Sequence, residues 1–98
     1  AVEALLKRIN MEADQFDVIE SNEAFSAQAL AVNKNLGLNP DKVNPNGGAI
    51  ALGHPVGATG AIITIKTMYE LERTGGRYGL MTMCIGGGQG IAMAIERL

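Results

Sequence analysis

Two glycine-framed segments, residues 47–57 and 84–90, most constrain what this chain can fold into. Glycine adopts backbone conformations that other residues rarely reach, and it lets a ligand approach the main chain closely. The first segment contains the only histidine of the chain, His54, and the second contains the only cysteine, Cys84. One imidazole, one thiol and a row of accessible amides indicate two turns that can host acyl chemistry.

The N-terminal part of the chain alternates between helical and extended patterns. A helical stripe covers residues 1–9, and a short strand is predicted over residues 16–20. We expect a second helix that starts at Ser21-Asn22-Glu23, with the acidic Glu23 in its first turn, and continues over residues 24–36. Gly37 is well placed to end this helix in a left-handed conformation.

The C-terminal part predicts a short extended piece at Val43, a third helix from Gly57 to about Thr74, and two β-type runs over residues 78–84 and 90–95. This order is that of an α/β fold that ends in an antiparallel pair. A parallel sheet needs a strand on either side of each crossover, yet the chain opens on a helix. We therefore expect a first strand upstream of residue 1.

The third predicted helix carries apolar residues on more than one side. Its main stripe consists of Ala58, Ala61, Ile62, Ile65 and Tyr69, opposite Thr59, Lys66, Thr67 and Glu70. Ile63 and Leu71 lie outside that stripe. This pattern predicts a helix that is covered on more than one side, as in the middle layer of a layered fold.

Composition and charge narrow the class of protein. The 98 residues, 47% apolar and 18% charged, fit one globular domain over residues 1–98. The net charge of −2, without a basic cluster, argues against nucleic acid and against an anionic membrane as partners. A lone cysteine fits a reducing compartment, so we expect the cytoplasm or an organelle matrix. One cysteine and one histidine are too few for a structural zinc site, and we expect no metal.

Each candidate residue has a structural and a chemical interpretation. Pro55 forces His54 into an extended conformation near a helix N-terminus, where a neutral imidazole can act as a base. His54 can equally be a hydrogen-bonded residue of a tight loop. Cys84 is either a small buried hydrophobe or a thiol beside an anion-binding nest of glycine amides. A phosphate loop is disfavoured because no Lys-Ser or Lys-Thr pair follows. Asn22 is either a helix N-cap or a ligand for a water or an acyl oxygen.

Three motifs in register resemble the thiolase family. They are Asn22-Glu23-Ala24-Phe25, Gly53-His54-Pro55 and Cys84-Ile85-Gly86-Gly87-Gly88-Gln89-Gly90. The resemblance covers nearly the whole chain, including the lead-in over residues 46–52 and the helix start Gly57-Ala58-Thr59-Gly60. It implies part of a thiolase C-terminal half-domain, a layered mixed sheet with helices on both faces, and the acyl-CoA chemistry of fatty acid metabolism.

The resemblance also implies a role for four residues. His54 would accept the proton of a nucleophilic cysteine, and Cys84 would move the proton on the α-carbon of acetyl-CoA. Asn22 would orient a water that forms one oxyanion hole with His54. Gly86 would supply a backbone N–H to a second oxyanion hole. Both reaction steps develop negative charge on a thioester oxygen, which fixed donors must stabilise.

Thiolases need two cysteines, and this chain has one. Cys84 matches the acid–base motif, so the nucleophile and most CoA contacts are expected in an N-terminal half, with a CoA thioester as substrate and no separate cofactor. We expect that half as a partner, a homo-oligomer (dimer or tetramer), and an inactive, marginally folded and self-associating chain when it is alone. A β-ketoacyl synthase, which uses a second histidine in place of this cysteine, and a non-catalytic lipid- or partner-binding module are the alternatives.

Overall fold

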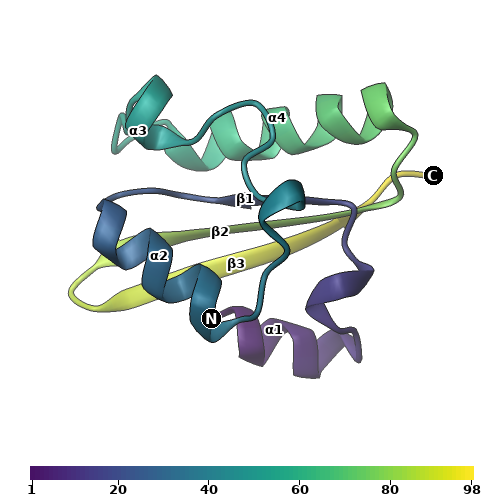
Figure 1. The fold of residues 1–98 in the computed structure, drawn as a ribbon, viewed down its shortest axis with the longest axis horizontal. Helices are drawn as coiled ribbons and strands as arrows, with labels where there is room; N and C mark the ends of the chain where they lie inside the picture. Colours follow the sequence, from purple (N-terminus) through teal and green to yellow (C-terminus); the bar gives the residue numbers. More distant parts are fainter.

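The computed structural model describes residues 1–98 as a three-stranded mixed sheet with helices on both faces (Figure 1). The strand order is β1-β2-β3, with β1 parallel to β2 and β2 antiparallel to β3. The elements are α1 (Val2–Ile9), η1 (Ala13–Gln15), β1 (Val18–Ser21), α2 (Ser26–Asn35), η2 (Pro40–Lys42), α3 (Ala49–Leu52), α4 (Thr59–Thr74), β2 (Tyr78–Gly86) and β3 (Gln89–Glu96). The predicted α/β class and the antiparallel end pair are confirmed.

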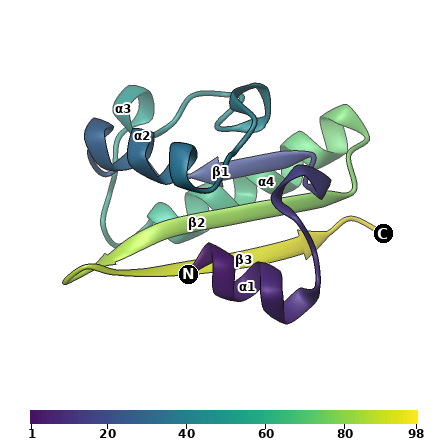
Figure 2. The ribbon, with the colours of Figure 1, turned by 60° about the horizontal axis from the view of Figure 1, so that its bottom comes forward.

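The hydrophobic core lies on the face of the sheet that α1 covers. Helix α1 runs along β3, on the opposite side of the sheet from α4 (Figure 2). The sheet register pairs Ile19 with Leu80, and both side chains are buried in one cluster with Val2, Phe16 and Leu38. Each side chain of this size stabilises the fold by roughly 1.5–3 kcal/mol when it is fully buried. The helical stripe expected over residues 1–9 therefore faces the core as predicted.

Helix α4 packs on the other face, against β1 and β2. It approaches β2 closely because Gly79 has no side chain, and a Cβ there would overlap the methyl group of Thr67. Thr67 is completely buried, and its hydroxyl donates a hydrogen bond of 2.7 Å to the carbonyl oxygen of Ile63. A threonine that bonds back to its own helix leaves no unsatisfied polar group at this contact.

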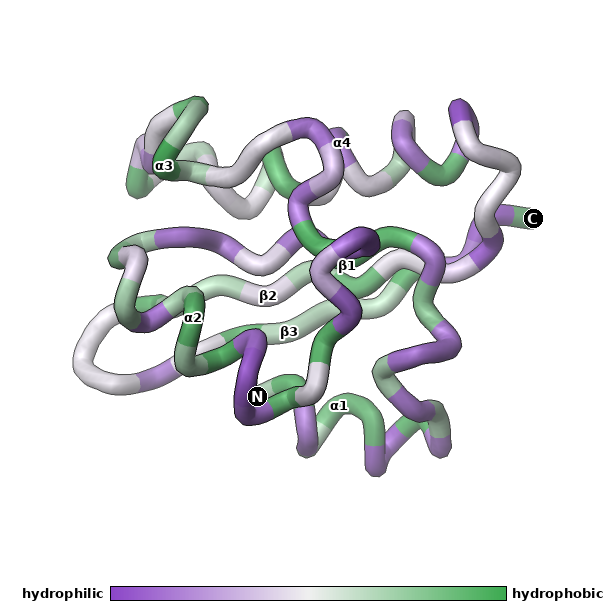
Figure 3. Tube along the Cα trace, viewed as in Figure 1, coloured by the Kyte–Doolittle hydropathy of each residue, from purple (hydrophilic) through white to green (hydrophobic).

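The apolar stripe of α4 does not face the sheet. Ile62, Ile65 and Tyr69 are 37%, 51% and 69% exposed. The side that faces the sheet consists of Thr59, Ile63, Thr67, Glu70 and Leu71. Figure 3 shows hydrophobic positions both in the strands at the centre of the molecule and along α4 at its edge. The helix thus packs a mixed polar and apolar side on the sheet and leaves its apolar stripe exposed. Cover of that second side stays a prediction.

The start of the second helix was predicted wrongly. Strand β1 continues to Ser21, and the backbone N–H of Asn22 still donates a hydrogen bond of 2.9 Å to Thr82. Helix α2 begins at Ser26, and its N-cap, Phe25, makes no side-chain capping bond. Asn22 is therefore no N-cap, and Glu23 lies outside the first turn. The end of α2 is as expected, because Gly37 has a φ of 60°.

The connecting segments differ in detail from the sequence pattern. Val43 makes a single parallel bridge to Ile19, which matches the expected short extended piece. The four-residue helix α3 was not predicted, and α4 begins at Thr59, two residues after the expected Gly57. None of the helices combines the length and the apolar character that a membrane crossing requires.

Candidate active site

His54 lies in the loop between α3 and α4, and its imidazole is held from one side. The ring nitrogen Nδ1 is 2.6 Å from the hydroxyl oxygen of Thr59, which is almost completely buried. That hydroxyl donates its proton to the carbonyl oxygen of Pro55 at 3.0 Å. Thr59 Oγ1 must then accept the hydrogen bond from His54 Nδ1–H, because a hydroxyl has one proton. This arrangement leaves a lone pair on Nε2, the form in which a neutral histidine acts as a base.

Asn22 approaches His54 from the other side. Its side-chain Nδ2 is 3.4 Å from His54 Nε2, although the two residues are 32 positions apart in the chain. An amide N–H can only donate, so the contact agrees with a lone pair on Nε2. Asn22 is 5% exposed and stands at the carboxyl end of β1, where its own backbone is tied to β2. The fold thus joins the first two motifs through one side-chain contact.

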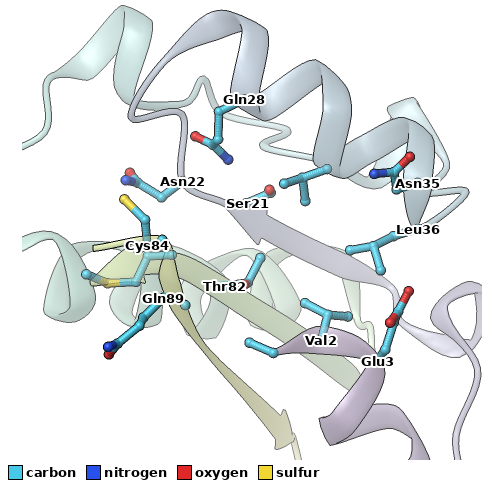
Figure 4. Close-up of a pocket in the computed structure, with 15 residues that line it drawn as sticks. Val2, Glu3, Ser21, Asn22, Gln28, Asn35, Leu36, Thr82, Cys84 and Gln89 are labelled. Carbon is cyan, nitrogen blue, oxygen red and sulfur yellow. The ribbon is translucent and has the colours of Figure 1, made fainter. Parts of the chain in front are cut away.

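Cys84 lies on β2 and lines a pocket of about 420 Å³ together with Asn22. Figure 4 shows its sulfur pointing toward the amide of Asn22, with Gln28 of α2 on the far side of the pocket. The thiol is half-buried and forms no disulfide. Asn22 therefore borders both the histidine and the thiol, whereas His54 does not line this pocket. The interpretation of Cys84 as a fully buried hydrophobe does not fit its position at the pocket wall.

Gly86, Gly87 and Gly88 form the tip of the hairpin between β2 and β3. Their φ angles are 93°, 60° and 75°, values that side-chain-bearing residues rarely adopt. The tip is exposed, and Gly86 lies two residues beyond Cys84, outside the residues that line the pocket. The four predicted site residues therefore occupy one end of the sheet, with Gly86 the most exposed among them.

Two comparisons with known proteins bear on this site. The family model for the thiolase C-terminal domain matches residues 1–97. The chain belongs to the thiolase family. It is similar over its full length to the beta-ketothiolase BktB of Cupriavidus necator (61% identity) and to a beta-ketoadipyl-CoA thiolase of Acinetobacter baylyi (59%), and over 95% of its length to an acetyl-CoA acetyltransferase of Shinella zoogloeoides (56%). It spans 25%, 25% and 24% of those relatives.

In this thiolase domain, side chains from several elements hold the loop that leads to the histidine. Asn44 pairs with the backbone of Ser21 through two hydrogen bonds, of 2.9 and 2.8 Å. Asn46 donates a hydrogen bond of 2.8 Å to Glu70 on α4. Hydrogen bonds from Arg73, the larger cause, and from Asn46 lower the pKa of Glu70 from 4.5 to about 2. The loop is therefore fixed to β1 at one point and to α4 at another.

Sequence reasoning missed two contributions to the thiolase site. Thr59 was predicted only as part of a helix start and of the polar side of that helix, although a hydroxyl five residues after a loop histidine can reach its ring. Glu23 was assigned to the first turn of α2, but its carboxylate accepts a hydrogen bond of 3.3 Å from the backbone N–H of Ile50 at the start of α3. A Cβ at Gly48 would overlap that carboxylate, so this glycine is needed for the close approach.

Proposed function

We propose that this domain supplies the acid–base part of a thiolase active site, which transfers acyl groups between CoA thioesters by Claisen condensation or thiolysis. One observation carries the proposal: Asn22 contacts the Nε2 lone pair of His54 and also borders the pocket of Cys84. A base, a thiol and an amide donor at one end of a sheet are the groups that two-step acyl transfer requires.

In the acylation step, His54 Nε2 takes the proton of a nucleophilic cysteine from the N-terminal half. The resulting thiolate attacks the thioester carbon, so that a new C–S bond forms and the carbonyl oxygen becomes an oxyanion. His54 Nε2–H and the Asn22 amide are then both donors, and with an oriented water they stabilise that charge. The bond to the CoA sulfur breaks, and the departing thiolate takes the thiol proton of Cys84, which is left as a thiolate.

In the condensation step, Cys84 as a thiolate removes a proton from the α-carbon of acetyl-CoA. The carbanion attacks the acyl-enzyme carbonyl carbon, and the nucleophilic cysteine leaves as a thiolate that takes back the proton from His54 Nε2. The backbone N–H of Gly86 would contribute to the second oxyanion hole. Thiolysis runs through the same steps in reverse, with Cys84 giving its proton to the acetyl-CoA carbanion. Cys84 thus acts on the C–H bond of the acetyl group, whereas the nucleophilic cysteine acts on the thioester bond.

The N-terminal half is the partner that this proposal requires. The relatives are about four times as long as this chain, which leaves ample length for a second half. The exposed side of α4 offers an apolar surface for it, with Ile65, Met68 and Tyr69 each more than half exposed. Exposed apolar patches of this kind mark interaction surfaces. We also propose that the complete enzyme is a homo-oligomer.

The test is thiolysis of acetoacetyl-CoA by CoA, measured with the enzyme that contains both halves and with the 98-residue chain alone. The intact enzyme should turn over, and the chain alone should not, because it has no nucleophilic thiol. Turnover by the chain alone that is lost on alkylation of Cys84 would place the nucleophile in this domain. A folded intact enzyme that binds acyl-CoA without thiolysis or condensation would instead favour a non-catalytic binding module.

A further inference from the structure

Lys66 connects three parts of the fold beneath the histidine loop. It lies on α4, and its ammonium Nζ is 2.8 Å from Glu20 Oε2 on β1. The same ammonium donates a hydrogen bond of 2.5 Å to the carbonyl oxygen of Gly47. The Lys66 side chain is 19% exposed and that of Glu20 is 1% exposed, so the pair is largely withdrawn from water. The sequence pattern had placed Lys66 on the polar side of the helix without a role.

We propose that Lys66, held in place by Glu20, is a positioning residue for His54. This inference rests on the proposed function, because it concerns the base of that reaction. Gly47 immediately precedes Gly48, the N-cap of α3, and α3 ends at Leu52, whose C-cap Gly53 adjoins His54. A bond to the carbonyl of Gly47 therefore fixes the start of the short helix that leads into the histidine loop.

The position of His54 is sensitive to small shifts of this loop. The contact between Asn22 Nδ2 and His54 Nε2 is 3.4 Å, at the long end of hydrogen-bond distances. A further displacement would separate the two donors that the oxyanion needs. Misplacement of a catalytic group by about 1 Å can cost about 10²-fold in rate, even when the mutation is remote from the chemistry.

The buried carboxylate of Glu20 is the counter-charge of the Lys66 ammonium. Burial raises the pKa of Glu20, and its second oxygen Oε1 has no hydrogen-bond partner. Lys66 is its ion-pair partner, so loss of the lysine would leave a buried charge uncompensated, a change that is strongly destabilising. The pair therefore has a structural effect that a test must separate from the positioning effect.

A double variant separates the two effects in the intact enzyme. In Glu20→Leu with Lys66→Met no charge of this pair remains, and replacement of a buried ion pair by apolar residues of similar volume is often neutral or stabilising. We expect its melting temperature to stay near that of the wild type. Its kcat for thiolysis of acetoacetyl-CoA should fall about tenfold or more, because nothing holds Gly47. The KM should stay within about twofold, since substrate contacts are unchanged.

Two single variants serve as controls. Glu20→Gln alone keeps an ammonium near Gly47 and an amide oxygen that can accept from it, so its loss of kcat should be smaller than that of the double variant. Lys42→Met removes a lysine that donates two hydrogen bonds of 2.8 Å to the backbone carbonyls of Asp14 and Phe16. These residues precede β1, whereas His54 contacts Asn22 beyond the other end of that strand. It should lower the melting temperature and leave the kcat unchanged.

Two results would overturn the inference, and they are distinguishable from failure of the proposed function. Wild-type kcat in the double variant would show that the pair only stabilises the fold. A kcat loss of the same size in Lys42→Met would show that any loss of stability lowers activity. A wild-type enzyme that performs no thiolysis would instead refute the proposed function itself.

Discussion

The histidine region and the glycine hairpin are built in different ways. His54 is held by side chains, with Thr59 on one ring nitrogen and Asn22 on the other, and both of these residues are buried. The hairpin tip holds its shape through the backbone alone, with three consecutive glycines at positive φ and every residue from Ile85 to Gly88 exposed. One region depends on long-range contacts, whereas the other depends on local conformation.

This difference predicts how the histidine region and the glycine hairpin would each contribute to catalysis. The imidazole has its tautomer set by Thr59 within this domain, so its orientation does not require a partner chain. The amides of the hairpin are open to solvent and can form an oxyanion hole only against a second group. Substitutions near His54 should therefore act through side-chain contacts, and substitutions in the hairpin should act through the main chain.

The largest effect is expected for His54→Ala in the intact enzyme. Loss of a general base typically costs about 10²–10⁴ in rate, and here it should slow both acylation by an acyl-CoA and the overall thiolysis. Rapid-quench measurement of the acyl-enzyme would report the first step separately. An acylation rate equal to that of the wild type would mean that another group deprotonates the nucleophile.

Gly86→Ala should produce the next largest effect. A left-handed conformation costs an alanine about 1–2 kcal/mol, so the backbone at φ 93° should shift and displace its N–H. Loss of one oxyanion donor costs about 10²–10³ in rate, which sets the upper limit of the effect on kcat.

Gly37→Ala is the matched control for this substitution. Gly37 has a φ of 60°, and a Cβ there would meet nothing within 4 Å, as at Gly86. It should lower the melting temperature without lowering kcat. Equal kcat values for the two variants would show that the hairpin amide has no special role.

Thr59→Val should have a smaller effect. Valine keeps the shape but removes the acceptor for His54 Nδ1–H, so the fraction of imidazole with a lone pair on Nε2 should fall. We expect about a tenfold loss of kcat, within the range of general-base contributions. Thr67→Val removes a buried hydroxyl from the same helix face and serves as the comparison. If both variants lose kcat equally, the effect comes from α4 and not from the histidine.

The smallest effect concerns acid stability. The pKa of Glu70 is lowered from 4.5 to about 2 by hydrogen bonds from Arg73 and Asn46. Its carboxylate therefore stabilises the fold above pH 4.5, and this contribution is lost as the pH falls toward 2. The melting temperature of Glu70→Gln should be lower than that of the wild type at pH 7, and the gap should narrow on acidification. A gap that is independent of pH would argue against the charged interaction.

Much of the fold could be predicted from local patterns, because those patterns have local causes. The stripe of α1, the left-handed Gly37 and the glycine hairpin each follow from spacing or from backbone freedom, and the structure confirms them. The side of α4 that faces the sheet could not be predicted. It is set by the close approach at Gly79 on β2 and by threonine hydroxyls that donate hydrogen bonds back to the helix. The spacing of apolar residues along the helix predicts neither feature.

The candidate site was predictable only in part for the same reason. His54 lies in a loop and Gly86 at the hairpin, as the glycines and Pro55 indicate, and Cys84 lies on β2 just before that hairpin. Their catalytic roles stay predictions. Asn22 has the local signature of an N-cap, but tertiary contacts with β2 and His54 prevail over it. The contacts made by Thr59 and Lys66 depend on how separate elements pack against each other. The spacing of residues along the sequence does not predict them.

The most direct test of the account is deuterium exchange at the methyl group of acetyl-CoA in the intact enzyme with Cys84→Ala. If Cys84 moves the α-proton and His54 serves the nucleophile, exchange should be abolished while acylation by an acyl-CoA persists. The two activities separate because two different thiols perform them. Exchange at the wild-type rate in this variant would contradict the assignment of Cys84 and with it the proposed division of the site.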